Sequence, residues 1–310
     1  MSGKPPTRVL SGVQPTGILH LGNYFGAIEQ HIALQHEFPG QAYYFIADYH
    51  ALTTVHDGQA LREYTRQVAI TYLALGLDPT RALLFCQSDV PEVLELAWML
   101  ATVTGMGLLQ RAHSYKDKIQ NGITPSAGLF FYPALMGADI LIYNSNLVPV
   151  GKDQLQHIEF AQDMATAFNH AYGGNKGKNK GKNKEKEEKE EKEPVLRRPE
   201  PRLSKSPYVP GTDGRKMSKS YGNTIPLFLS GKKLRKLIGK IVTDSAELGQ
   251  PLTIEHNTVY SLLQLFCDEA EMQTIAGWFK AGARDGQAFG YGHAKQLLAN
   301  KIDTHFAAAR

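Results

Sequence analysis

One loop of this chain combines several residue types that are suited to phosphate chemistry. Residues 211–224, GTDGRKMSKSYGNT, form a stretch bounded by glycines. Its cations and hydroxyls are Arg215, Lys216, Lys219, Ser218 and Ser220. A mobile cationic loop can close over a polyphosphate and neutralise the charge that develops on a departing phosphate group. A basic surface loop would explain each lysine or serine alone, but the pentapeptide KMSKS at 216–220 is far more specific.

A second loop follows the first strand-like run, in SGVQPTGILHLGNYFGAIEQ at 11–30. Its glycines lead into the start of a helix-like stretch. Backbone amides and a helix N-terminus bind phosphate, and open α/β sheets bind ligands at the carboxyl ends of their strands. By itself this signal is weak, because Gly17, Gly22 and Gly26 would serve equally well as turn and packing glycines.

The elements that would position these loops alternate along the chain. Strand-like apolar runs occupy 8–13, 42–47, 82–87 and 147–151. Stretches with apolar residues at helical spacing occupy 23–36, 58–75 and 154–168. Alternation of strand and helix predicts an α/β fold with a parallel, doubly wound sheet.

The rest of the chain divides by composition. Residues 174–193 hold eight lysines and six glutamates, which predicts a solvated segment, and a tolerated surface insertion is favoured over RNA contact by its basic half. Helical patterns follow at 234–242, 259–266 and 293–302. We expect a catalytic domain of 1–172 and 195–225, a low-complexity insertion at 173–194, and a smaller α-helical domain at 226–310.

The last residues, LLANKIDTHFAAAR, stop at Arg310 within an amphipathic helical pattern. Neither a glycine cap nor a proline follows, although helices commonly end with such signals. We therefore expect the helical domain to be C-terminally incomplete. The alternative is that the remaining helices suffice and the last turns fray.

Composition favours a folded cytoplasmic protein without a membrane span. The 310 residues are 42% hydrophobic, and no run approaches the roughly 20 apolar residues of a spanning helix. Met1 to Arg8 lacks the apolar core of a signal peptide. The two cysteines, Cys86 and Cys267, lie in apolar runs and read as reduced core thiols. A net charge of +4 neither demands nor excludes a polyanionic partner.

Two motifs together resemble the signatures of class I aminoacyl-tRNA synthetases. HLGN at 20–23 resembles HIGH, and KMSKS at 216–220 matches the second signature in full, in the expected order. Leu21 and Asn23 depart from HIGH, and a tetrapeptide that ends in GN resembles the tryptophanyl branch. Further segments that resemble this branch are SGVQPTG at 11–17, YPALMGADILIY at 132–143, VPVGKDQLQHIE at 148–159 and VTDS at 242–245. The resemblance covers nearly the whole chain outside the lysine/glutamate segment.

The resemblance implies activation of L-tryptophan by ATP and its transfer to tRNA(Trp) by a homodimer. The attacking carboxylate is already an anion, so such a site aligns reactants and stabilises charge without a general base. The implied catalytic residues are His20, Lys118, Lys216, Lys219 and Ser220. The implied ATP-binding residues are Gln14, Pro15, Thr16, Gly22, Asn23, Gly151, Lys152, Asp153, Val209, Lys216, Met217, Ser218, Lys219 and Ser220. Mg²⁺ is implied as the partner of ATP, and no acidic cluster in the sequence defines a protein metal site.

Tryptophan selection is expected to depend on a buried carboxylate. The indole nitrogen is a donor only, and Asp139 lies inside the apolar run LMGADILIY. A charge there is expensive to bury unless paired, so Asp139 is either functional or part of a structural ion pair, and we favour function. Met136, one turn earlier, would pack on the indole or serve as an ordinary core residue. Gln154 and Gln14 are candidates for the substrate ammonium and carboxylate.

Three other interpretations remain open. A tyrosyl-tRNA synthetase would share the fold and both signatures, but its site tends to carry a tyrosine on the first strand, where this chain has Leu10 and Ser11. A catalytically idle paralogue could serve as an RNA-binding module, although intact KMSKS, Asp139 and GKDQ argue against it. A nucleotidyltransferase of related fold is weakened by the tryptophan-type pocket residues.

Overall fold

The computed structural model describes residues 7–112, 115, 124–151, 154–173, 194–203 and 208–310. The chain forms two compact units. The sheet unit contains Met1–Thr16, His31–Ala69 and Leu77–Ser204, and the loop-helix unit contains Gly17–Gln30, Ile70–Gly76 and Lys205–Arg310. The two segments that carry HLGN and KMSKS therefore belong to the same unit.

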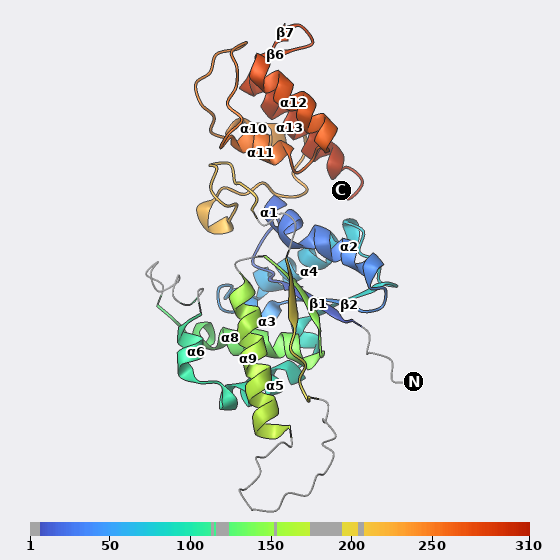
Figure 1. Cartoon of the computed structure of the whole chain (residues 1–310), viewed down its shortest axis with the longest axis vertical. Helices are drawn as coiled ribbons and strands as arrows, with labels where there is room; N and C mark the ends of the chain where they lie inside the picture. The colour runs from blue at the N-terminus through green and yellow to red at the C-terminus, as the bar shows by residue number, and fades with distance from the viewer. Residues whose placement is uncertain (1–6, 113–114, 116–123, 152–153, 174–193, 204–207) are drawn as a thin grey trace, which may run out of the picture. The chain divides into compact units, whose positions relative to one another are not determined.

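The sheet unit is built on five parallel strands in the order β3-β2-β1-β4-β5, of which β1 and β2 are labelled in Figure 1. They are β1 (Val9–Val13), β2 (Ala42–Ile46), β3 (Ala82–Cys86), β4 (Leu147–Val150) and β5 (Glu200–Leu203). The predicted parallel sheet and its four apolar strands are confirmed. The fifth strand, EPRL, was not predicted because it lacks an apolar run. Pro201 is tolerated there because β5 lies at the edge of the sheet.

Helices cover both faces of this sheet. On one face, α8 (Ala127–Ile142) and α9 (Leu155–Tyr172) bury Ile140, Ile158 and Ala161 against residues of β1, β2 and β4. Behind them pack α5 (Glu92–Val103) and α6 (Met106–Gln110). On the other face, His31 of α2 (Glu29–Glu37) stacks on Tyr44 with ring centroids 4.7 Å apart. The doubly wound arrangement is thus confirmed. The remaining helices near the sheet are α3 (Asp48–Ala51) and α4 (Gly58–Ala74).

The loop-helix unit contains the C-terminal helices and the helix start after HLGN. Its elements are α1 (Leu21–Asn23), the π-helical turn η1 (Tyr24–Ile28), α10 (Gly231–Gly239), α11 (Thr258–Leu263), α12 (Glu269–Ala281), β6 (Ala283–Arg284), β7 (Gln287–Ala288) and α13 (Tyr291–His305). The helix predicted for 23–36 begins at Leu21 and contains the π-helical turn. Tyr24 in this turn donates or accepts a hydrogen bond with His305 at 3.0 Å and packs against Phe306. These aromatic contacts join the HLGN segment to α13.

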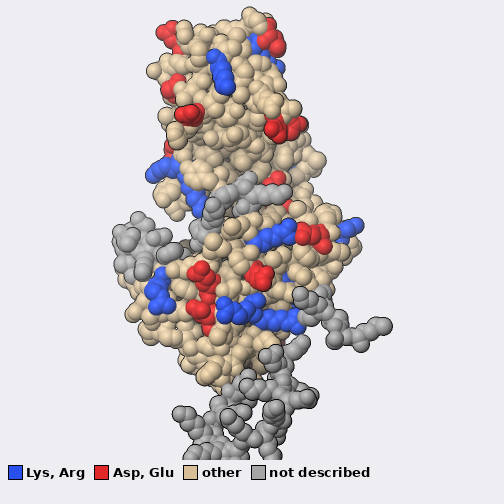
Figure 2. All heavy atoms as spheres, viewed as in Figure 1, with Lys and Arg blue, Asp and Glu red and all other residues tan. Residues whose placement is uncertain are grey.

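Charge is distributed evenly over the visible surface. On the face shown in Figure 2, basic and acidic side chains are interspersed, in keeping with a net charge of only +4. None of the helices among the described residues combines the length and apolar character that a bilayer crossing requires. The lysine/glutamate insertion predicted at 173–194 falls, apart from its two end residues, outside the described residues.

Candidate active site

The chain segments that follow four strands of the sheet unit carry candidate site residues. Gln14 follows β1, Gln87 follows β3 and Gly151 follows β4, while α3 with His50 begins just after β2. Because the strands are parallel, these ends meet at one edge of the sheet, where open α/β sheets bind ligands. Among the predicted residues here, Gln14 is exposed and Pro15 is buried. Thr16 and Gly151 are half-buried.

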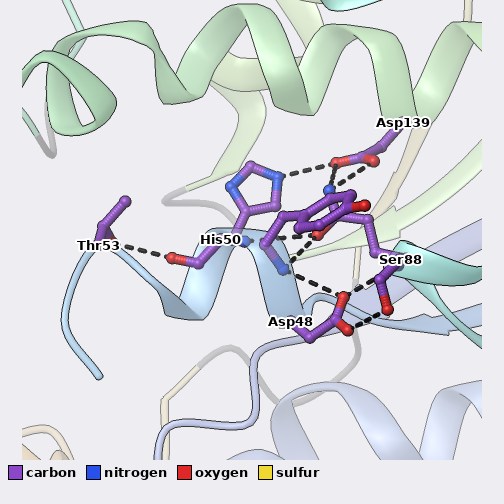
Figure 3. A network of polar contacts seen from close by, with 7 residues as sticks. Asp48, His50, Thr53, Ser88 and Asp139 are labelled. Atoms are coloured by element: carbon purple, nitrogen blue, oxygen red, sulfur yellow. Dashed lines mark hydrogen bonds and ion pairs between the residues drawn. The ribbon is translucent and has the colours of Figure 1, made fainter. Parts of the chain in front are cut away.

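Asp139 lies on α8 with only 2% of its surface exposed, and its carboxylate is held by two side chains from this edge. His50 Nε2 lies 2.8 Å from Oδ2, and Gln87 Nε2 donates to Oδ1 at 2.8 Å and to Oδ2 at 3.0 Å (Figure 3). The Gln87 carbonyl in turn accepts the backbone N–H of Tyr49 at 3.1 Å. The carboxylate is therefore fixed by residues from two separate segments, α3 and the turn after β3.

The environment of Asp139 has opposing effects on its ionisation. Burial raises the pKa of Asp139, while hydrogen bonds from His50 and Gln87 act to lower it. A carboxylate offers about four lone-pair sites. Oδ1 accepts one hydrogen bond and Oδ2 accepts two from the residues that the structure describes, so Oδ1 retains capacity for a further donor.

His50 and Gln87 were missed in the sequence interpretation. Both are buried, at 5% and 2% exposure. Gln87 directly follows β3, in FCQSD, and His50 lies four residues after the end of β2, in FIADYHA. A polar residue within a few positions of the carboxyl end of an apolar strand is the signal that would have found them. Nearby, Asp48 accepts the backbone N–H of Ser88 at 3.1 Å, which ties the ends of β2 and β3 together (Figure 3).

A second series of hydrogen-bonded side chains in the sheet unit is centred on His157 of α9. Its Nε2 lies 2.7 Å from the Tyr132 hydroxyl, and its Nδ1 lies 2.8 Å from Oε1 of Gln154. A neutral imidazole would accept from the hydroxyl and donate to the amide oxygen. The predicted residue Gln154 is thereby oriented, and its backbone N–H donates to Gly151 at 3.0 Å. Met136 is half-buried and packs against the core between α8 and the sheet.

In the loop-helix unit, backbone pairing joins the HLGN and KMSKS segments. Leu21 N donates to the Ile225 carbonyl at 3.0 Å, and Leu227 N donates to the Leu19 carbonyl at 3.1 Å. Met217, the buried methionine of KMSKS, lies against Gly22, where an added Cβ would be 3.4 Å from the Met217 Cβ. Two motifs nearly 200 positions apart are thus brought together.

Lys219 and His20 face the same small region of this unit. Lys219 Nζ donates to the Gly17 carbonyl at 3.0 Å, and burial lowers the pKa of Lys219 to about 8. Burial and the charge of Lys219 lower the pKa of His20 to about 4. His20 is therefore neutral at pH 7. Its Nδ1 is buried and has no hydrogen-bond partner among the residues that the structure describes.

The remaining predicted residues occupy varied positions. Asn23 Oδ1 accepts the backbone N–H of His20 at 3.0 Å. Lys216 and Ser220 are exposed, and Ser218 accepts the Ser220 N–H at 3.3 Å. Val209 is buried and accepts the Met217 N–H at 2.8 Å. Lys118, Lys152 and Asp153 lie outside the described residues.

Comparison with known proteins identifies the family. Residues 1–307 match the model for tRNA synthetases class I (W and Y). The chain belongs to this family. It is 50% identical to the tryptophan–tRNA ligase of Rhodopirellula baltica and 47% identical to that of Fusobacterium nucleatum, over 98% of this chain and 87% and 85% of those relatives. The crystal structure of the Campylobacter jejuni tryptophanyl-tRNA synthetase complexed with ADP and tryptophan superposes with a TM-score of 0.82 at 43% identity, covering 98% of this chain and 87% of that one.

The family match covers both groups of polar residues. The match spans the sheet unit with Asp139 and the loop-helix unit with the two signatures. Class I synthetases need a nucleotide site and an amino-acid site, and the two groups supply different chemistry. The carboxylate of Asp139 suits a donor ligand, while the lysines and amides of the other unit suit an anion. Within the described residues, no group of three or more His, Cys, Asp or Glu side chains is placed to hold a metal ion.

Proposed function

We infer that this protein activates L-tryptophan with ATP to form tryptophanyl-adenylate and transfers it to tRNA(Trp). The observation that carries this proposal is Asp139, a carboxylate buried at the ligand-binding edge of the sheet and held by His50 and Gln87. The named relatives at 47 to 50% identity, both tryptophan–tRNA ligases, support the same substrate.

Asp139 accepts the indole N–H in this proposal. Oδ1 of Asp139 can accept a further hydrogen bond. The two side chains that hold the carboxylate leave it little freedom to rotate away from the indole. Met136 packs on the indole ring, and Gln154 and Gln14 bind the ammonium and carboxylate groups. His157 and Tyr132 keep the amide of Gln154 in one orientation. The donor of a tyrosine side chain is its terminal O–H, which lies farther from the backbone than the indole N–H, so it would not meet Oδ1 at the same position.

The nucleotide is bound, in this proposal, by the residues that the family resemblance implies. The proposed ATP-binding residues are Gln14, Pro15, Thr16, Gly22, Asn23, Gly151, Lys152, Asp153, Val209, Lys216, Met217, Ser218, Lys219 and Ser220. The tryptophan carboxylate attacks the α-phosphorus, the bond to the β-phosphate oxygen breaks, and pyrophosphate leaves. Lys216, Lys219 and Lys118 neutralise the charge that this leaving group develops. His20, being neutral, donates a hydrogen bond rather than a charge.

The remaining partners follow from this reaction. Mg²⁺ would be bound by the oxygens of the ATP phosphates. tRNA(Trp) is the acceptor of the activated amino acid, and the proposed assembly is a homodimer in the cytoplasm. Residues 226–310 are proposed as a domain of the anticodon-binding type.

ATP–pyrophosphate exchange with each of the twenty amino acids tests the proposal. Tryptophan alone should support rapid exchange, with tyrosine disfavoured by about 10⁴ in kcat/KM. Asp139→Ala should cost roughly 2 to 4 kcal/mol in kcat/KM for tryptophan, while the exposed Asp163→Ala serves as the control. Equal exchange with tyrosine would overturn the substrate assignment. Absence of exchange with every amino acid would favour an idle paralogue.

A further inference from the structure

Asn223, three residues beyond the KMSKS pentapeptide, lies at the centre of the loop that carries it. Its side chain is only 2% exposed. Its Nδ2 donates to Oδ1 of Asp213 at 2.7 Å and to the Lys216 carbonyl at 3.2 Å, and its Oδ1 accepts the Ser218 N–H at 2.8 Å. One amide group thus holds three points of the loop, all within the loop-helix unit.

The chemistry of these contacts requires an amide in one orientation. A carboxylate and a carbonyl need donors, and a backbone N–H needs an acceptor. If the amide were rotated by half a turn, its oxygen would face the carboxylate and the carbonyl and its NH₂ would face the N–H, so all three hydrogen bonds would be lost. An aspartate would supply the acceptor but neither donor. The hydrogen bond from Asn223 is also the largest influence that lowers the pKa of Asp213.

The backbone around Asn223 is shaped to receive this side chain. The chain leaves Ser218, makes the 3₁₀ turn η4 (Lys219–Tyr221), and returns through Gly222 at φ 63°, a left-handed conformation that favours glycine. Opposite, an added Cβ at Gly211 would lie 2.2 Å from Nδ2 of Asn223. The Thr212 N–H donates to the Asn223 carbonyl at 3.0 Å. A longer glutamine side chain has no space here.

We propose that Asn223 is a positioning residue for activation, which holds the backbone of Lys216 and Ser218 so that the lysines of KMSKS meet the triphosphate in one geometry. This inference rests on the proposed function. Asn223 itself does not contact the reacting atoms in this role. It acts on Lys216 directly and on Lys219 through Ser218, which caps the turn that carries Lys219. Preorganisation of charge around the leaving group raises kcat rather than substrate affinity.

Steady-state exchange kinetics on the full chain test this proposal. Asn223→Ala should lower kcat by about 10²-fold, the size expected when catalytic groups are misplaced by an ångström. KM for tryptophan should stay within about twofold of wild type, because ground-state binding of the amino acid is not altered. A variant with wild-type kcat, or with its loss confined to KM for tryptophan, overturns the proposal.

A matched control separates positioning from general stability. Asn257 is a buried asparagine of the same unit whose side chain accepts the Tyr260 N–H at 2.9 Å and donates to the Tyr291 hydroxyl, so that both of its partners lie outside residues 211–224. Asn257→Ala should lower the melting temperature and leave kcat at the assay temperature unchanged. If both variants lose stability and kcat in proportion, Asn223 is merely structural.

Two further variants keep the test decisive if Asn223→Ala does not fold. Asn223→Asp is nearly isosteric and should still lose kcat, and adding Asp213→Asn should restore part of it by reversing the donor and acceptor of that hydrogen bond. In a Lys216→Ala background, loss of Asn223 should cost less than in wild type, because the two act together. Additive effects, or no rescue by the exchanged pair, would contradict the proposal. Wild type without tryptophan-dependent exchange would instead sink the proposed function.

Discussion

At the scale of single residues, burial sets the charge of the groups beside the nucleotide loops. Lys219 is half-buried and His20 buried, and each has its pKa lowered mainly by loss of solvent. His20 stays neutral over the physiological range. Lys219, by contrast, loses its proton close to working pH, so its contribution to catalysis depends on pH.

The alkaline pH dependence of exchange should therefore report Lys219. With a pKa of about 8 in the free protein, Lys219 is charged below this pH and neutral above it. The value of kcat/KM for ATP, which reflects the free protein, should fall as the pH rises through about 8. The corresponding fall in kcat should lie at higher pH, because a bound triphosphate raises the pKa of a nearby lysine. Exchange rates measured from pH 6 to 10 give both profiles.

Lys219→Arg is the matched variant for this measurement. A guanidinium remains charged throughout this range, so the alkaline fall should move to higher pH even where the maximal rate is reduced. An alkaline fall at the same pH in the arginine variant would assign it to another group.

At the scale of elements, one asparagine joins the two ends of the lysine/glutamate insertion. Asn169, near the end of α9, donates to the Leu196 carbonyl at 2.7 Å and accepts the Leu196 N–H at 2.9 Å. Gln162, two turns earlier on α9, donates to the Pro199 carbonyl at 2.7 Å. The segment that leads into β5 is thus held against α9 by hydrogen bonds that do not involve residues 174–193.

Deletion of residues 174–193 with a short glycine/serine linker should accordingly be tolerated. Loop closure costs only about 0.6 kcal/mol per doubling of length, so the free energy of unfolding should change by no more than about 1 kcal/mol. Urea unfolding and exchange rates on the shortened chain check this. Asn169→Ala should destabilise the full and shortened chains alike. A collapse of exchange in the shortened but folded chain would show that the insertion has a role in activation.

At the scale of the whole molecule, exposed apolar side chains on α5 and α6 favour the proposed homodimer. Trp98 is 70% exposed and Met106 61%, with Leu94 and Met99 also exposed. Large apolar side chains gathered on neighbouring elements commonly mark protein interfaces, and tryptophan is enriched among the residues that dominate their energetics.

Sedimentation of wild type and of Trp98→Glu tests this surface. Wild type should sediment as a dimer, and the variant should weaken the dimer by at least about 2 kcal/mol. Leu248→Glu, at a similarly exposed apolar residue of the other unit, should leave the dimer intact. A monomeric wild type, or a Trp98→Glu dimer of unchanged affinity, would exclude α5 as the interface.

The sequence by itself determined the features that depend on local pattern. Apolar runs predicted β1 to β4, and their alternation with helical stretches predicted the parallel sheet, because burial of both faces requires continuous apolar strands. The KMSKS pentapeptide and the lone Asp139 in an apolar run were also visible locally. These led to the family and to most of the candidate site residues.

Only the tertiary structure decided which distant residues meet. Strand β5 has a polar sequence and forms because β4 offers it an edge, not because of its own pattern. His50 and Gln87 reach Asp139 across 89 and 52 positions, and Asn223 is defined by the loop that folds around it. Hydrogen bonds of this kind carry no periodicity that a sequence displays. They exist because a buried polar group must find a partner, and the fold alone determines which partner lies within reach.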